Sequence, residues 1–406
     1  MSFDELAALD AGHVMGTYAR LPVAFVRGEG SRLWDSEGRE YLDFLGGLAV
    51  TSLGHAHPEV AEALAEQART LLHVSNLYYN DVQPRLAAEI DGLLGGARGP
   101  GGDHRSGGRV FFSNSGAEAN ECAIKLVRRY GQKRAVPHTY HVVSALNSFH
   151  GRTLTTLAAT GQPVKQAAFQ PMPPGFWQVP YGDIGALEEQ AERFGERLAA
   201  VLLEAVQGEG GVWPAPPGYL EAVRGLCDRT GALLILDEVQ TGLGRTGRWF
   251  AFEHFGIRPD VVTMAKALGN GVPIGACWAT AEAAGAFEPG DHATTFGGQP
   301  LAARAALTTL QIMQRENVPE LSRRAGARLA EGLARTPGIT GVRGLGLLLA
   351  AELAPGIDSK AAAAACLEGG LIVNAVTPTA LRFEPSLLVT DEEIEEALTM
   401  LGKALA

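Results

Sequence analysis

Short apolar runs dominate the chain between residues 109 and 280, and stretches with helical spacing separate them. The runs have the length and the branched or aromatic composition of buried strands, whereas the stretches between them have the periodicity of amphipathic helices. The predicted strands are 109–113, 141–146, 200–206, 232–239, 261–265 and 275–280. The predicted helices include 117–130 and 217–230. This alternation predicts an α/β fold with a mostly parallel sheet.

The pattern changes on both sides of this region. The expected flanking elements are short strands at 22–44, helices at 58–72 and 83–94, a long helix from 301, short strands at 342–353 and 371–384, and an acidic helix from Asp391. A chain of 406 residues exceeds the size at which one core usually stops growing. We therefore expect a large domain (55–300), a smaller α+β C-terminal domain (301–406) and an N-terminal segment (1–54) that packs with the smaller domain. The glycine-rich segment 95–108 predicts a mobile surface loop.

Two of the apolar runs deliver a charge where they end. The run 233–236 is followed by Asp237, and the run 261–265 is followed by Lys266. The carboxyl ends of parallel strands line the ligand crevice of such a sheet, so a carboxylate and an amine can meet there across one bound molecule. Lysine is scarce in this chain, with six lysines against 28 arginines. A strand-end lysine that reaches water would give the same pattern, so this pair alone leaves both interpretations open.

A third signal lies between the strand at 109–113 and the helix that follows it. Residues 113–120 read Ser-Asn-Ser-Gly-Ala-Glu-Ala-Asn, and a strand-to-helix junction of this kind presents free backbone N–H groups and the positive end of the helix dipole to an anion. A serine N-cap before any helix looks similar. A phosphate site, an aspartate for a ring nitrogen and a lysine for an aldehyde together predict pyridoxal 5′-phosphate as the cofactor.

Composition and charge narrow the possible partners. The net charge of −11 argues against nucleic acid or an anionic membrane as the main partner. No apolar run reaches the length of a membrane span and the N-terminus does not resemble a signal peptide, so we expect a cytoplasmic protein. Four scattered cysteines predict buried thiols. His55 and His57 are a weak metal signal, and we expect no metal site but a loop or helix-capping role.

The sequence resembles the class III, fold-type I aminotransferases that act on ω-amino groups, and among them the acetylornithine aminotransferases. The resemblance covers nearly the whole chain. The segments that carry it are 18–24, 115–119, 149–153 (Phe-His-Gly-Arg-Thr), 236–242 (Leu-Asp-Glu-Val-Gln-Thr-Gly), 295–298 and Arg382-Phe383. The fold it implies is a large domain with a mostly parallel sheet and a smaller α+β C-terminal domain.

The resemblance implies specific contacts to the cofactor. Lys266 would form the Schiff base, Asp237 would pair with the pyridine nitrogen, and Gln240 would hydrogen-bond the ring hydroxyl. The remaining contacts would be Phe149 and Val239 on the two faces of the ring, and Ser115, Gly116 and Ala117 at the phosphate. Thr295 would reach the phosphate of the neighbouring subunit, so the resemblance also implies a homodimer with active sites at the interface.

Substrate recognition in this family implies a second set of residues. Arg152 would bind the α-carboxylate of the ornithine moiety with help from Tyr18, because a guanidinium grips a carboxylate with two donors. Arg382 would bind the α-carboxylate of glutamate or 2-oxoglutarate, and Glu209 would neutralise Arg382 while the other substrate is bound. The implied reaction transfers the δ-amino group of N-acetyl-L-ornithine to 2-oxoglutarate in a ping-pong cycle, a step of arginine biosynthesis.

Several alternatives stay open at this stage. Enzymes of lysine biosynthesis that act on a carrier-bound or N-modified precursor share these motifs, and ornithine, succinylornithine and 4-aminobutyrate aminotransferases share most of them. An aminomutase of the same fold would need no 2-oxoglutarate, and a non-catalytic binding protein would not need Lys266. Ala205, Ala293 and Gln299 depart from the usual family residues. They lie near the expected cofactor and subunit boundary, so they bear on substrate preference rather than on chemistry.

Overall fold

The computed structural model describes residues 1–95, 107–134, 136 and 138–406. The helices are α1 (Phe3–His13), α2 (Gly46–Ala49), α3 (Pro58–Thr70), α4 (Gln83–Gly95), α5 (Gly116–Lys133), α6 (Leu154–Ala159), α7 (Pro163–Gln166), α8 (Ile184–Phe194), α9 (Tyr219–Thr230), α10 (Ala281–Ala284), α11 (Pro300–Arg315), α12 (Val318–Arg335), α13 (Ser359–Glu368) and α14 (Asp391–Leu405). The strands are β1 (Phe25–Glu29), β2 (Arg32–Asp35), β3 (Glu40–Asp43), β4 (Arg109–Ser113), β5 (His141–Ala145), β6 (Phe176–Val179), β7 (Leu198–Leu203), β8 (Val206–Gln207), β9 (Trp213–Pro214), β10 (Leu233–Asp237), β11 (Val261–Met264), β12 (Gly275–Ala279), β13 (Ile339–Leu345), β14 (Leu348–Leu353), β15 (Leu371–Ile372), β16 (Asn374–Thr377) and β17 (Ala380–Phe383).

The central sheet has the order β4-β12-β11-β10-β7-β5-β6. β12 is antiparallel to both of its neighbours, and the other pairs are parallel. This confirms the predicted α/β class and the six predicted strands. The edge strand β6 was not predicted from the sequence, because its residues are mostly half-buried and include the polar Gln178, so no continuous apolar run marks it.

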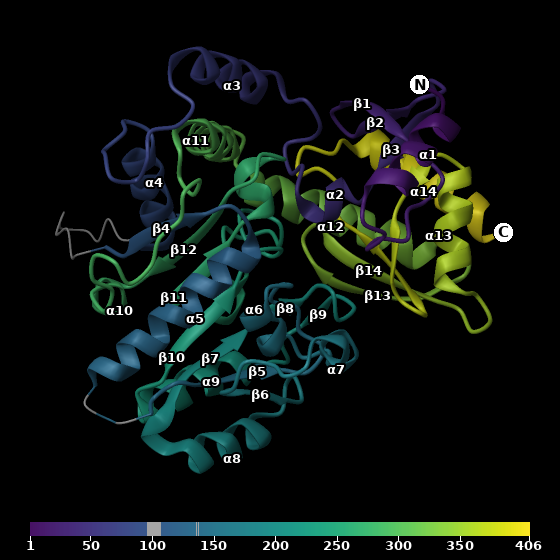
Figure 1. Ribbon diagram of the computed structural model, residues 1–406. Helices are drawn as coiled ribbons and strands as arrows, with labels where there is room; N and C mark the ends of the chain where they lie inside the picture. The colour runs from purple at the N-terminus through teal and green to yellow at the C-terminus, as the bar shows by residue number, and fades with distance from the viewer. Residues whose placement is uncertain (96–106, 135, 137) are drawn as a thin grey trace.

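Helices cover both faces of this sheet. Along β10, Leu233 and Ile235 pack in one apolar cluster with residues of α5, whereas Leu234 and Leu236 pack in another with residues of α8 and α9. Successive side chains of a strand point to opposite faces, so a strand that is apolar throughout must be covered on both sides. The continuous apolar run of β10 is explained by this double burial, and Figure 1 shows α5 lying across the strands.

The two ends of the chain form a separate group of elements (Figure 1). One sheet has the order β13-β14-β17-β16, and another has the order β1-β2-β3-β15. β3 pairs in parallel with β15, with Leu42 opposite Leu371. The N-terminal strands therefore lie against C-terminal residues, although the domain limits at residues 54 and 300 stay a prediction.

The structure corrects one predicted element. The long helix expected from residue 301 is two helices, α11 and α12, and Asn317 between them has a φ of +52°. Asparagine is one of the few non-glycine residues that adopt this left-handed conformation readily, and Pro319 occupies the first turn of α12 where its missing N–H costs nothing. The boundary was therefore marked by Asn-Val-Pro, which the apolar spacing alone did not reveal.

The structure also bears on four smaller predictions, which concern the cysteines, His57, the loop 95–108 and membrane-spanning helices. The four cysteines are buried and unpaired, which confirms the thiol prediction. His57 occupies the N-cap position of α3 without a capping hydrogen bond from its side chain, so of the two expected roles the loop position is observed and side-chain capping is not. Most of the predicted loop 95–108 lies outside the described residues. Within the described part of the chain, no helix is long and apolar enough to cross a lipid bilayer.

Candidate active site

The two charges that end apolar runs lie at the same edge of the central sheet. Asp237 is the last residue of β10 and is paired with Thr263 of β11. Lys266 follows the end of β11 by two residues and begins a 3₁₀ turn rather than continuing the strand. Its φ is +43°, a conformation that costs a non-glycine residue about 1–3 kcal/mol and that the surrounding structure must hold in place.

The carboxylate of Asp237 is held by three donors. Its Oδ2 accepts hydrogen bonds from Asn120 Nδ2 at 2.7 Å and from His150 Nδ1 at 2.8 Å, and its Oδ1 accepts one from the backbone N–H of Val239 at 3.1 Å. Thr263 Oγ1 in turn donates to Asn120 Oδ1 at 2.7 Å. These bonds fix the orientation of a buried carboxylate. Neither Asn120 nor His150 was predicted as a site residue, although both lie in the motifs that were singled out.

The junction between β4 and α5 has the expected form. Ser115 is the N-cap of α5, and its Oγ accepts a hydrogen bond from the backbone N–H of Glu118 at 3.2 Å. Gly116 and Ala117 form the first turn, where backbone N–H groups are free to bind an anion. A Cβ atom on Gly116 would lie 2.7 Å from Val239 Cγ1, so only glycine fits beside Val239 at this place. The N-cap is thus observed, and it is compatible with a phosphate site.

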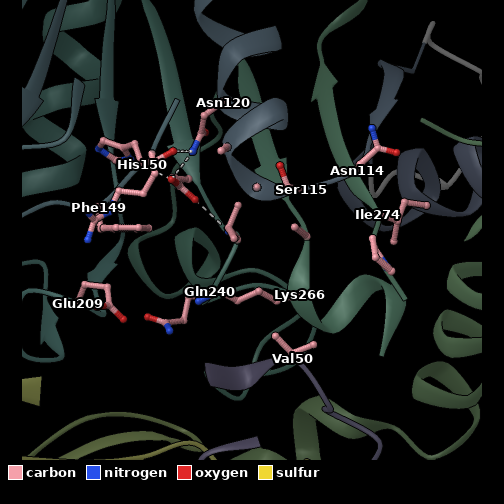
Figure 2. Close-up of a pocket in the computed structure, with 18 of the residues that line it drawn as sticks. Val50, Asn114, Ser115, Asn120, Phe149, His150, Glu209, Gln240, Lys266 and Ile274 are labelled. Carbon is pink, nitrogen blue, oxygen red and sulfur yellow. Dashed lines mark hydrogen bonds and ion pairs between the residues drawn. The ribbon is translucent and has the colours of Figure 1, made fainter. Parts of the chain in front are cut away.

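These elements surround a cavity of about 400 Å³. Figure 2 shows Phe149 to the left of Lys266 and Ser115 above it. The predicted site residues that line it are Ser115, Gly116, Ala117, Phe149, Arg152, Glu209, Asp237, Val239, Gln240 and Lys266. A volume of this size is within the usual range for a cofactor or small-ligand pocket.

The cavity has the donor and acceptor groups that pyridoxal 5′-phosphate needs. Gln240 Nε2 is buried and has no hydrogen-bond partner among the described residues, which leaves a donor for the hydroxyl of a bound ring. The Asp237 carboxylate can face a protonated ring nitrogen, and the α5 N-terminus can take a phosphate. The residues present therefore fit this cofactor.

Burial and nearby charges set the state of the Lys266 amine. Burial lowers the pKa of Lys266, because an apolar environment disfavours the ammonium form. The charge of Arg382 lowers the pKa of Lys266 further. Three carboxylates raise it, Glu384 most and then Glu209 and Asp237, but the net pKa is lowered. A lysine with a lowered pKa releases its proton more readily than a solvent-exposed lysine, as catalysis at neutral pH requires.

Arg382 lies beside this cavity between two carboxylates. Its Nη1 is 2.9 Å from Glu209 Oε1, and its Nε is 3.4 Å from Glu384 Oε2. Arg382 and Glu384 are almost completely buried, whereas the side chain of Glu209 is 29% exposed. Burial raises the pKa of Glu209, but the charge and hydrogen bond of Arg382 outweigh it, so the net pKa is lowered. The Arg382–Glu209 pair is therefore present as expected.

The sequence reasoning missed Glu384. Arg382 lies on β17, and Glu384 follows two positions later, just after the strand ends. The alternation of strand side chains therefore places both on the same side of the sheet. A carboxylate at the end of the apolar segment Leu-Arg-Phe-Glu-Pro was the available signal.

Two cations lie over the ring of Phe149. The Arg152 guanidinium carbon is 5.6 Å and the Lys165 Nζ is 5.0 Å from the ring centroid. Arg152 is exposed at the mouth of the cavity, so its guanidinium is accessible to the carboxylate of a substrate. Lys165 lies on α7 and was not predicted as a site residue, because the polar segment around it gives no signal in the sequence.

The structure does not bring Tyr18 or Thr295 into the cavity. The side chain of Tyr18 is mostly solvent-exposed. Thr295 is also exposed and lines a different cavity, together with Asn76 and Leu77. Both were expected to act on substrate or on a neighbouring subunit, so their roles stay predictions.

Comparisons with known proteins agree with this site. The chain is 46% identical over 398 residues to the acetylornithine aminotransferase of Caldanaerobacter subterraneus subsp. tengcongensis, covering 97% of each chain. It is 49% identical over 399 residues to that of Gloeobacter violaceus, covering 97% of this chain and 96% of the relative. The ornithine aminotransferase of Toxoplasma gondii, whose crystal structure has pyridoxal phosphate at partial occupancy in the active site, matches with a TM-score of 0.91 at 35% identity, covering 100% of this chain and 94% of that one.

The family assignment confirms the fold-type I architecture and the expected cofactor. The model of the family described as aminotransferase class-III matches residues 15–405, which is nearly the whole chain. The protein therefore belongs to the class III aminotransferases, which are pyridoxal-phosphate-dependent transaminases.

Proposed function

We propose that this protein transfers the δ-amino group of N-acetyl-L-ornithine to 2-oxoglutarate, giving N-acetyl-L-glutamate 5-semialdehyde and L-glutamate, a step of arginine biosynthesis. The observation that carries the proposal is the pair of arginines in different states: Arg152 is exposed at the mouth, and Arg382 is buried and covered by Glu209. Such a site offers one carboxylate grip at first and a second only after Glu209 moves. The names of the relatives support the same substrate.

The side chains around the cavity divide the work of holding the cofactor. Bound pyridoxal phosphate supplies an electron-accepting ring for the electron pair that a substrate leaves when it loses a proton. Asp237 would keep the ring nitrogen protonated, and its three hydrogen bonds hold its carboxylate in a fixed orientation. Gln240 would donate a hydrogen bond to the ring hydroxyl. The proposed packing contacts are Phe149 and Val239 on the ring faces, with Ser115, Gly116 and Ala117 at the phosphate.

Lys266 has two roles in this proposal. Lys266 would hold the cofactor through its aldehyde group, and the amine of Lys266, once free, would move a proton at the substrate carbon. The lowered pKa of Lys266 suits the second role, because the neutral amine is the form that accepts a proton. The turn that Lys266 begins places it in the lining of the cavity, where its amine would be within reach of a bound cofactor.

The two substrates use the arginines in turn. Arg152 binds the α-carboxylate of N-acetylornithine and directs its terminal amine to the centre of the site, with Tyr18 as the proposed second contact. While Glu209 covers Arg382, a substrate that offers its α-amine next to its carboxylate finds no guanidinium near the reacting atoms. When Glu209 swings towards solvent, Arg382 binds the α-carboxylate of glutamate or 2-oxoglutarate. The partial exposure of Glu209 gives it room to make this movement.

A homodimer is part of the proposal. Thr295 is exposed in this chain, where we propose that it contacts the phosphate held by the neighbouring subunit. Large apolar side chains near it are also exposed, among them Leu77 (87%), Tyr79 (101%) and Phe296 (67%). Large apolar side chains that are left exposed in this way are typical of a surface that another subunit covers. The cytoplasmic location stays a prediction.

A half-reaction screen tests the proposed substrate. The holoenzyme is mixed with N-acetyl-L-ornithine, L-ornithine, 4-aminobutyrate or N-acetyl-L-lysine, and conversion of the cofactor is followed by its visible absorbance in the absence of 2-oxoglutarate. We expect the highest kcat/KM with N-acetyl-L-ornithine. A higher kcat/KM with N-acetyl-L-lysine would instead assign the protein to a lysine-type pathway. Turnover of many equivalents of the substrate without 2-oxoglutarate would indicate an aminomutase.

A further inference from the structure

Lys165 is a second cation beside the predicted carboxylate-binding arginine. Its Nζ lies 5.0 Å from the centroid of the Phe149 ring, over which the Arg152 guanidinium also lies at 5.6 Å. Neither cation has a carboxylate within ion-pair distance among the residues that the structure describes. Two like charges that share one aromatic ring and lack counter-ions are unfavourable unless something else benefits from them.

We propose that Lys165 is a specificity-determining residue that favours a diamino acid whose α-amine is acylated over one whose α-amine is free. The inference rests on the proposed function, in which Arg152 holds the α-carboxylate. Lys165 lies over the same aromatic ring as Arg152, so the substituent on the α-carbon of a carboxylate bound at Arg152 would lie near both cations. A free α-amine is an ammonium ion at neutral pH and is repelled by Lys165, whereas an acylated α-amine is a neutral amide.

The amide also offers an attractive contact. Its carbonyl oxygen is a hydrogen-bond acceptor, and the ammonium group of Lys165 has three donors that no protein acceptor occupies among the described residues. Specificity then arises from a favourable contact to one substrate and repulsion of the other. The same ammonium group also strengthens the positive field that attracts the α-carboxylate, but acylated and free diamino acids share this contribution, so the discrimination comes from the α-nitrogen alone.

Lys165 is half-buried beside the site, and its surroundings shift its pKa in opposite directions. Burial lowers the pKa of Lys165, and the charge of Arg152 lowers it further, while Glu209 acts in the opposite direction. Glu209 is therefore near enough to sense Lys165, and it also pairs with Arg382 at 2.9 Å. The position of Lys165 over Phe149, rather than in bulk water, reduces the solvent screening of the charge that its protonated form carries.

The test measures discrimination between two substrates that differ only in the acyl group. Single-turnover kcat/KM values are determined for N-acetyl-L-ornithine and L-ornithine with the wild-type holoenzyme and with Lys165→Met, which keeps a long flexible side chain without the charge. We expect the ratio of the two values to fall about tenfold in Lys165→Met. Tenfold corresponds to about 1.4 kcal/mol, which lies between the limits for two unit charges in water and in a partly buried site.

Control variants separate charge from packing. Lys165→Arg keeps the charge, and we expect its ratio to stay within about threefold of wild type. Lys360→Met removes an exposed lysine on α13, far along the chain from the site, and should leave the ratio unchanged. Lys165→Gln replaces Lys165→Met if the latter does not retain cofactor.

The outcomes distinguish the two proposals. If the wild-type enzyme does not convert N-acetyl-L-ornithine, the proposed function fails. If it does, but the ratio changes by less than threefold in Lys165→Met, or changes equally in Lys165→Arg, the role of Lys165 is wrong while the proposed function stands. A fall in the ratio in Lys165→Met alone supports both.

Discussion

Glu209→Gln separates the charge of Glu209 from its shape. The Gln side chain can still reach Arg382, but the guanidinium then keeps only one carboxylate partner, Glu384, in a place where Arg382 is buried. Glutamate must displace the side chain at position 209 to reach Arg382, so weakening that contact favours glutamate. The N-acetylornithine half-reaction uses Arg152 and gains nothing from this change. We therefore expect kcat/KM to rise for glutamate relative to N-acetylornithine.

The size of the effect follows from the geometry. Two unit charges about 4 Å apart interact by about 4 kcal/mol at an effective dielectric constant of 20, which sets the scale for this pair. The partial exposure of Glu209 and the remaining amide hydrogen bond reduce the net loss to about 1.5–3 kcal/mol, the range for a hydrogen bond to a charged group. This corresponds to a change of roughly 10- to 150-fold in the ratio of the two kcat/KM values.

Both half-reactions are measured in single turnovers by the absorbance of the cofactor, and Glu196→Gln, an exposed glutamate in the turn before β7, is the matched control. Equal changes in both half-reactions would show that Glu209 acts on the reacting centre rather than as a cover for Arg382. A decrease for glutamate would show that Glu209 helps to bind that substrate, which would refute the proposed movement.

Three further predictions concern the cofactor site and the subunit contact. Gly116→Ala places a Cβ atom 2.7 Å from the stiff side chain of Val239, so we expect cofactor affinity to fall by about 1–3 kcal/mol in an absorbance titration, and unchanged affinity would show that Val239 moves freely. Lys266→Met should stabilise the protein without cofactor at neutral pH, because a lowered pKa means that the folded state disfavours the ammonium form. Since the unfolded chain then binds more protons, wild-type stability should rise with pH from the lowered folded pKa to about 10.4, relative to Lys266→Met, in thermal unfolding scans; parallel curves would contradict this. Tyr79→Arg puts a charge on the exposed apolar surface and should shift sedimentation towards a monomer, with loss of activity; an intact dimer would show that this surface is not the contact.

The residues at the centre of the site could be predicted from the sequence because each is marked by a short local pattern. Apolar runs that end in Asp237 and Lys266, and a serine N-cap before α5, are each visible within ten residues. Parallel pairing then brings the strand ends to one edge of the sheet, so no long-range information is needed. The fold class follows from the same alternation of elements.

The remaining parts of the site depend on contacts between distant segments. Asn120 reaches Asp237 across 117 positions, and Arg382 meets Glu209 from another sheet. Nothing in the polar segment around Lys165 indicates that α7 packs near Phe149. Charge partners of this kind are set by tertiary packing, which neither propensity nor periodicity describes. The place of Thr295 further depends on a second chain, so one chain alone cannot determine it.

The parallel pairing of β3 with β15 has a consequence for co-translational folding. Leu42 has its partner only when Leu371 has left the ribosome, 329 residues later. At a synthesis rate of about 5–20 residues per second, this is a delay of roughly 16–66 s during which the N-terminal strands have an open edge. The central sheet, whose strands lie between residues 109 and 279, can assemble in that time. We therefore expect β1 to β3 to be among the last elements to become protected during translation, and the most exposed to chaperones and proteases until then.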